Sequence, residues 1–96
     1  RLLDNAARMG ALLQRELLAL RDRFPLIEGV RGQGLMVGVV LDRPAKPLET
    51  AMLERGLITI ATNENVIRLV PPLVVNQADI RRAVRTVDEA ASALAI

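Results

Sequence analysis

The sequence contains no cysteine and no histidine, and Phe24 is its only aromatic residue. Without cysteine the chain can form neither a disulfide nor a thiolate metal site, and this agrees with a reducing cytoplasm. Histidine is the commonest general acid–base residue and cysteine the best nucleophile at neutral pH, so both are unavailable here. The one serine, Ser92, has no candidate base near it. We therefore expect no catalytic residue and no metal site in this chain.

The arginines produce a net charge of only +2, although the isoelectric point is about 10.4. The high value arises because almost no side chain titrates between the carboxylates and the guanidinium groups. Acidic residues alternate with the arginines, and aromatic side chains that could stack on bases are lacking. No apolar run is long enough to cross a membrane. We expect neither a nucleic-acid nor a membrane partner, and a cytoplasmic location.

Three helices are predicted from apolar spacing. Apolar side chains recur every three or four residues from Leu2, which predicts a helix over 2–23 that ends before Pro25. A short helix is expected over 47–56, with Gly56 as its C-terminal stop. Asn76 is a predicted N-cap for the last helix, and Asp79 occupies the capping-box position.

Three strands are predicted between these helices, over 30–41, 57–61 and 66–70. The resulting fold class is α+β: a two-layer small domain of order α-β-α-β-β-α, with a short mixed or antiparallel sheet and helices on one face. The stretch RGQGLMVG lacks the third glycine of a dinucleotide-binding loop and leads into a strand. We interpret it as a tight bend followed by a close backbone approach at Gly38.

Lys46 is the only lysine and therefore the only residue that could form a Schiff base. Such lysines lie in desolvated pockets, whereas Lys46 lies between Pro44 and Pro47 in a polar loop. We interpret it as a solvated surface residue.

Arg68 lies within the apolar strand VIRLV, where a permanent cation is costly unless it meets an anion or water. One interpretation is a surface arginine whose head reaches water and pairs with Glu64. The other is a guanidinium that binds a carboxylate through two parallel hydrogen bonds. Pro71 and Pro72 stiffen the adjoining backbone, which favours the second interpretation slightly.

VIRLVPPLVV, VRGQGLMVGVVL, ERGLITI and LLDNAARMGALLQREL together resemble the C-terminal small domain of class III pyridoxal-phosphate-dependent aminotransferases. The resemblance covers residues 1–96 and is nearest to the members that act on N-acetylornithine and ornithine. It implies that Arg68 binds the carboxylate of a substrate or of a large-domain glutamate. It also implies transfer of an amino group to or from 2-oxoglutarate in arginine biosynthesis, by a homodimer.

The family's Schiff-base lysine and most of its cofactor contacts lie in a large domain that this chain does not contain. The resemblance therefore implies that residues 1–96 close the active site, are inactive alone and do not bind pyridoxal phosphate alone. The alternative is a free-standing α+β module that binds an amino acid or a partner protein without chemistry.

Overall fold

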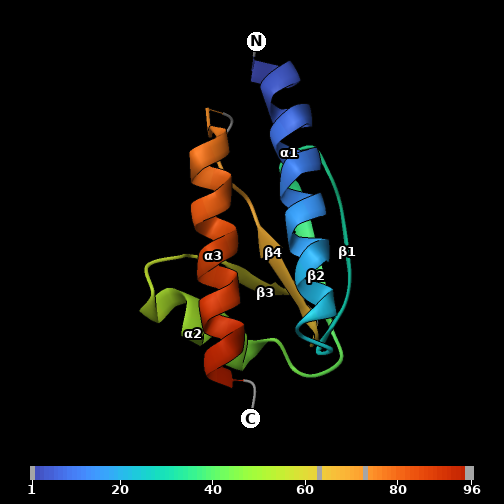
Figure 1. Cartoon of the computed structure of the whole chain (residues 1–96), viewed down its shortest axis with the longest axis vertical. Coiled ribbons are helices and arrows are strands. Elements are labelled where there is room, and N and C mark those ends of the chain that lie inside the picture. Colours follow the sequence, from blue (N-terminus) through green and yellow to red (C-terminus); the bar gives the residue numbers. More distant parts are fainter. Residues whose placement is uncertain (1, 63, 73, 95–96) are drawn as a thin grey trace.

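The protein forms a four-stranded sheet beneath helices (Figure 1), in a computed structural model that describes residues 2–62, 64–72 and 74–94. All neighbouring strands are antiparallel, in the order β1-β2-β4-β3. Helices α1 and α3 lie side by side over one face, and α2 packs against α3 near β3. The α+β class is confirmed. The elements are α1 (Leu2–Ala19), a 3-10 turn (Leu20–Asp22), β1 (Ile27–Gln33), β2 (Met36–Leu41), α2 (Lys46–Glu54), β3 (Ile60–Thr62), β4 (Val66–Leu69) and α3 (Gln77–Leu94).

The chain has one strand more than the sequence predicted, so the element order is α-β-β-α-β-β-α. The single strand expected over 30–41 is a hairpin of β1 and β2, which turns at Gly34 with a φ of 57°. Charged residues and glycines alternate along β1, which gives it the composition of a loop. These residues have a low intrinsic preference for strands, and pairing with β2 compensates for it.

Strand β3 begins three residues later than predicted, at Ile60. The chain leaves α2 through Gly56, whose φ is 86°, and the Leu57 amide still donates to the Met52 carbonyl at 2.9 Å. This helix-closing turn keeps Leu57 out of the sheet. The predicted stop at Gly56 is correct, but the strand cannot start directly after it.

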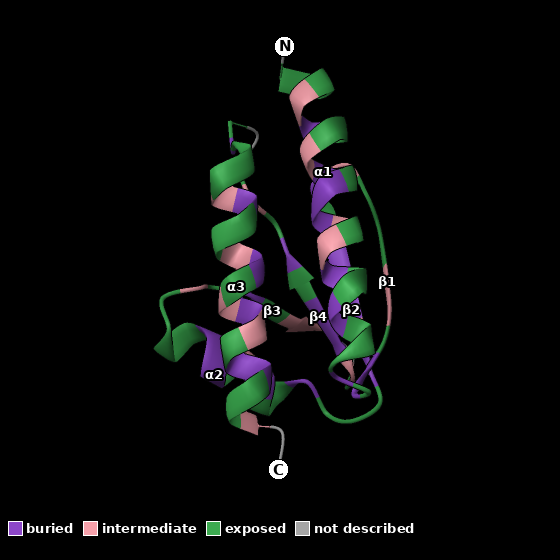
Figure 2. Cartoon of the chain, in the orientation of Figure 1, coloured by how far each residue is buried: buried purple, intermediate pink, exposed green. Residues whose placement is uncertain are grey.

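The core lies between the sheet and the helices (Figure 2), and it is aliphatic apart from Phe24. In β4, Ile67 and Leu69 are buried, whereas Arg68 between them is exposed; Val66, on the same face as Arg68, is buried too. This period of two places one face of the sheet against the helices and leaves the other face, here called the open face, without a helix. The largest of the fully buried side chains are Leu13, Leu17, Ile27, Val37, Val39, Leu41, Leu48, Met52, Ile67, Ile80 and Val87.

Helix α3 begins with the predicted capping box. The Asp79 amide donates to Asn76 Oδ1 at 2.9 Å, and the Asn76 amide donates to Asp79 Oδ2 at 3.1 Å. Two backbone N–H groups that a helix start leaves unpaired are therefore satisfied.

Glu49 connects α2 to β3. Its Oε2 accepts a hydrogen bond from the Ala61 amide at 2.8 Å, and its Oε1 lies 3.0 Å from Lys46 Nζ. The pKa of Glu49 lies below its ordinary value of 4.5. The hydrogen bond from the Ala61 amide is the largest cause, and the hydrogen bond from the Lys46 ammonium is the second. A carboxyl whose pKa is lower in the folded state stabilises the fold above its unfolded pKa, and this stability is lost as the pH falls through the folded pKa.

We expect Glu49→Gln to lower the thermal unfolding temperature at pH 7. Gln can still accept the hydrogen bond from the Ala61 amide, but without the charge this hydrogen bond is weaker. The difference from the native sequence should shrink as the pH falls below the ordinary value of 4.5. Thermal unfolding of both proteins across pH 3 to 7 measures it. A difference that is the same at every pH would show that the charge of Glu49 contributes nothing.

Candidate functional site

Arg68 projects from the middle of β4 onto the open face. It is paired with Gly38 of β2 on one side and with Ile60 of β3 on the other. Gly38 is in turn paired with Arg31 of β1. A single row therefore crosses all four strands in the order Arg31, Gly38, Arg68, Ile60. Since paired residues of adjacent strands project to the same side, both arginines share the open face.

Gly38 leaves the space between the two arginines open. It has no side chain, and a Cβ added there would meet the Val66 Cγ1 at 3.3 Å. The backbones of Arg31 and Arg68 are two strand spacings apart, or roughly 10 Å. The close backbone approach predicted at Gly38 is not observed, because the nearest backbone atom to that Cβ, the Arg31 carbonyl oxygen, lies at an ordinary contact distance of 3.8 Å. Gly38 instead forms the floor of a depression between two guanidinium groups.

This depression has a volume of about 450 Å³ and no carboxylate in its lining. Among the described residues, neither Arg31 nor Arg68 forms an ion pair or a side-chain hydrogen bond. The predicted Glu64 partner of Arg68 is not observed. The depression is lined by Arg31, Gly32, Gln33, Met36, Gly38, Thr62, Val66 and Arg68.

Acidic side chains are gathered elsewhere on the sheet. Glu28, Asp42 and Glu64 line a separate depression, where Arg43 forms an ion pair with Asp42 at 2.7 Å. The arginine end of the open face therefore has an excess of positive charge, which favours an anion. A carboxylate could accept two parallel hydrogen bonds from either guanidinium.

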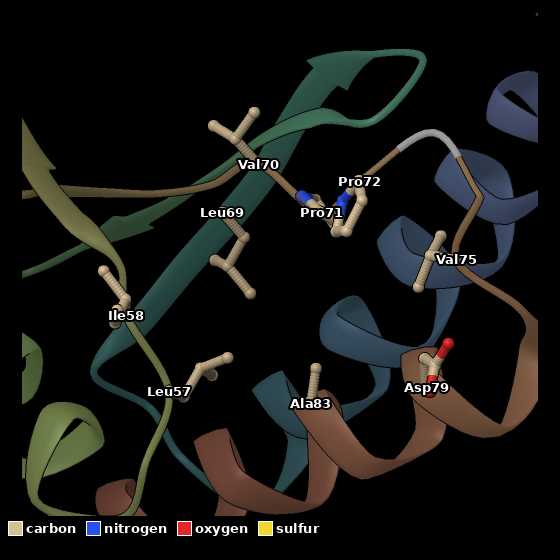
Figure 3. Close-up of a pocket in the computed structure, with 9 residues that line it drawn as sticks. All are labelled: Leu57, Ile58, Leu69, Val70, Pro71, Pro72, Val75, Asp79 and Ala83. Carbon is tan, nitrogen blue, oxygen red and sulfur yellow. The ribbon is translucent and has the colours of Figure 1, made fainter.

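An apolar groove lies on the other side of the β4 end (Figure 3). Its volume is about 420 Å³, and Leu57 and Ile58 face Pro71 and Pro72 across it. The one carboxylate in its lining, Asp79, already caps α3. The groove therefore offers apolar surface and no cation, and it is a poor site for an acid.

Lys46 does not suit a carbonyl cofactor. Its side chain is 80% exposed and lies 3.0 Å from Glu49 Oε1, so it lies in solvent rather than in a desolvated pocket. The residues of this chain therefore do not fit covalent attachment of such a cofactor. The described parts of the chain also contain no group of three side chains that could hold a metal ion, and no helix long and apolar enough to cross a membrane.

Arg68 was predicted as a candidate from the sequence, whereas Arg31 was not. An arginine within an apolar strand is conspicuous, whereas Arg31 lies among glycines and polar residues. Its relation to Arg68 depends on the register of the β1–β2 hairpin, which pairs it with Gly38. No local pattern in the sequence indicates that register.

The chain is similar to known proteins over nearly its whole length. The family described as Aminotransferase class-III matches residues 1–91. Acetylornithine aminotransferase of Mesorhizobium japonicum is 35% identical over 94 residues, which cover 97% of this chain and 24% of that protein. The Corynebacterium efficiens enzyme of the same name is 46% identical over 82 residues, which cover 84% and 19%.

The fold matches as well. The crystal structure of acetylornithine aminotransferase from Elizabethkingia anophelis superposes with a TM-score of 0.90 at 29% identity, over 96% of this chain and 25% of that one. The chain thus spans about a quarter of the length of the proteins it matches.

Proposed function

Because this chain belongs to the class III aminotransferases, we propose that it is the C-terminal small domain of such an enzyme and that Arg68 binds a carboxylate there. The matched relatives are about four times as long as this chain, so a parent enzyme with a separate large domain accounts for the difference. The observation that supports the role of Arg68 is its unpaired guanidinium beside a depression with no carboxylate in its lining.

The names of the relatives suggest the substrates. Several are acetylornithine aminotransferases, and others are ornithine aminotransferases. We propose that the parent transfers an amino group between N-acetylornithine or ornithine and 2-oxoglutarate in arginine biosynthesis, as a cytoplasmic homodimer. Pyridoxal phosphate, the cofactor that the family implies, acts as an electron sink when bound. The family implies that its attachment lysine lies in the large domain, and Lys46 of this chain does not fit that role.

The contribution of this chain is to bind and orient an acid. Arg68 is held by a strand with a neighbour on each side, so its backbone is fixed before the substrate arrives. A carboxylate of the amino acid or 2-oxo acid accepts two hydrogen bonds from the guanidinium. When the domain closes over the large domain, water is excluded and these bonds become stronger.

Assays of the purified parent enzyme test this function. With pyridoxal phosphate bound, the parent should form glutamate from N-acetylornithine and 2-oxoglutarate. Residues 1–96 alone should form none and should cause no shift in the absorbance of the cofactor. A parent gene that encodes no large domain, or an isolated chain that transaminates, would contradict the proposal.

A further inference from the structure

Strand β3 forms one edge of the sheet, with β4 as its neighbour on the inner side. Backbone groups along an antiparallel strand point alternately toward one side and the other. The Ala61 amide donates to Glu49 Oε2 at 2.8 Å, so this N–H points away from β4. Ala61 is therefore the residue of β3 whose backbone faces outward, and the Glu49 carboxylate covers its amide.

The segment that contains this edge has the composition of a strand that pairs readily. LITIAT, residues 57–62, has no charged residue and no proline, and most of its side chains are β-branched. Ile58 and Ile60 are 79% and 52% exposed. The nearest charged residues along the chain are Arg55 and Glu64. An uncharged, β-branched segment at a sheet edge can pair with a strand of another chain.

The sheet uses only half of this segment. Strand β3 begins at Ile60, and the facing chain continues from β4 into Pro71 and Pro72. Proline has no N–H that could extend the ladder. The two chain segments are separated there by the apolar groove, with Leu57 and Ile58 on one side and the prolines on the other (Figure 3). Residues 57–59 thus lie outside the sheet and could lengthen β3 if a new strand joined it.

We propose that Glu49 blocks this edge: by occupying the outward N–H of Ala61, it prevents residues 57–62 from pairing with the same segment of a second copy of the protein. The segment suits a copy of itself, because two uncharged antiparallel strands related by a two-fold axis meet without charge repulsion. This inference goes beyond the proposed function and does not depend on it, because it concerns a backbone edge and is read out as association.

Helix α2 holds Glu49 in place for this role. The side chain is only 20% exposed, and its Oε1 lies 3.0 Å from Lys46 Nζ, one turn earlier in the helix. Its Oε2 accepts a charge-assisted hydrogen bond, which is stronger than the neutral bond that a second strand could offer to Ala61. The carboxylate has no N–H of its own, so the hydrogen-bond ladder ends at Glu49.

Static light scattering of the full-length protein that contains this chain tests the role of Glu49. Glu49→Ala should form assemblies larger than the native protein at a concentration at least about tenfold lower, because the loss of one charge-assisted hydrogen bond corresponds to that factor. Glu49→Gln should associate less than Glu49→Ala, since its amide oxygen still accepts from Ala61. Glu54→Ala, which removes an exposed carboxylate of the same helix, should behave as native.

Second substitutions in the Glu49→Ala background distinguish edge pairing from a general loss of stability. Ala61→Pro removes the outward N–H, which β4 does not use, so it should restore the native state of association. Ile58→Lys places a charge on the segment and should do the same, and it serves if Ala61→Pro does not fold. Neither substitution restores the link between α2 and β3, so association caused by lower stability would persist in both.

Hydrogen exchange measured by mass spectrometry locates the pairing. In assemblies of Glu49→Ala, the amides of the peptide that spans residues 57–62 should be at least as protected as in the native protein, because a second strand replaces Glu49. Native association in Glu49→Ala, association that persists with Ile58→Lys, or faster exchange of this peptide in the assemblies would each overturn the inference. Equal association in Glu54→Ala would do so as well, because it would make the effect one of net charge.

Discussion

Replacing Arg68 by Gln in the parent enzyme is expected to lower kcat/KM for the carboxylate substrate by roughly ten- to a hundredfold. Hydrogen bonds to charged groups contribute about 1.5–3 kcal/mol, and 1.4 kcal/mol corresponds to a factor of ten. Among the described residues, the neighbours of Arg68 in its row are Gly38 and Ile60, so no second cation is paired directly with it. Steady-state kinetics with N-acetylornithine and 2-oxoglutarate measure the effect.

Two further variants show whether the loss of kcat/KM comes from the paired hydrogen bonds of Arg68. Arg68→Lys keeps the charge but loses the paired hydrogen bonds, so it should fall between the native enzyme and Arg68→Gln. Arg85→Gln removes an exposed arginine on the helical side and should behave as native. The cofactor absorbance should remain unchanged in all three variants, because Arg68 is proposed to contact the substrate. Native kinetics in Arg68→Gln would refute the carboxylate role.

Gly10→Ala is expected to destabilise the small domain by about 3 kcal/mol, the upper end of the usual cost of overpacking. Gly10 lies in α1 against the turn of the β1–β2 hairpin, and a Cβ there would lie 1.8 Å from the carbonyl oxygen of Gly34. The atom in the way is backbone, so no side-chain rotation relieves the clash. Gln14 Nε2, one turn further along α1, donates to the Gly32 carbonyl at 3.2 Å, so the hairpin is tied to the helix at this place.

The sign of this effect makes it informative. In an exposed helix interior, replacing Gly by Ala stabilises by about 1 kcal/mol, so helix propensity alone predicts a gain. Ala11→Gly, at the next and exposed position, is the matched control and should cost about 1 kcal/mol. Soluble yield and the thermal unfolding temperature of the parent enzyme measure both variants. A higher unfolding temperature in Gly10→Ala would show that the hairpin does not pack against α1 as described.

Much of the fold could be predicted because its signals are local. The apolar stripe that contains Leu13 and Leu17 predicts α1, and the Asn76–Asp79 capping box predicts the start of α3. Strand β1 could not be predicted, because its stability comes from pairing with β2 rather than from its own residues. The end of α1 is also displaced, since the last turn tightens into a 3-10 turn before Pro25.

In the candidate site, too, the features with local signals could be predicted, whereas those that depend on strand pairing could not. The alternation of Ile67, Arg68 and Leu69 is a property of one strand, and the structure confirms that Arg68 projects away from the core. The floor at Gly38 and the second arginine, Arg31, depend on the pairing of three strands. These features bring together residues that are distant in sequence, and no periodicity within one segment encodes them.

Binding of a non-reacting dicarboxylate tests the role of Arg68 most directly, because it separates recognition of the acid from chemistry. Isothermal titration of the cofactor-loaded parent enzyme with glutarate should give a dissociation constant roughly ten- to a hundredfold weaker for Arg68→Gln than for the native enzyme. Arg85→Gln should bind glutarate as the native enzyme does. Equal affinities in the native enzyme and Arg68→Gln would show that this guanidinium does not bind the acid.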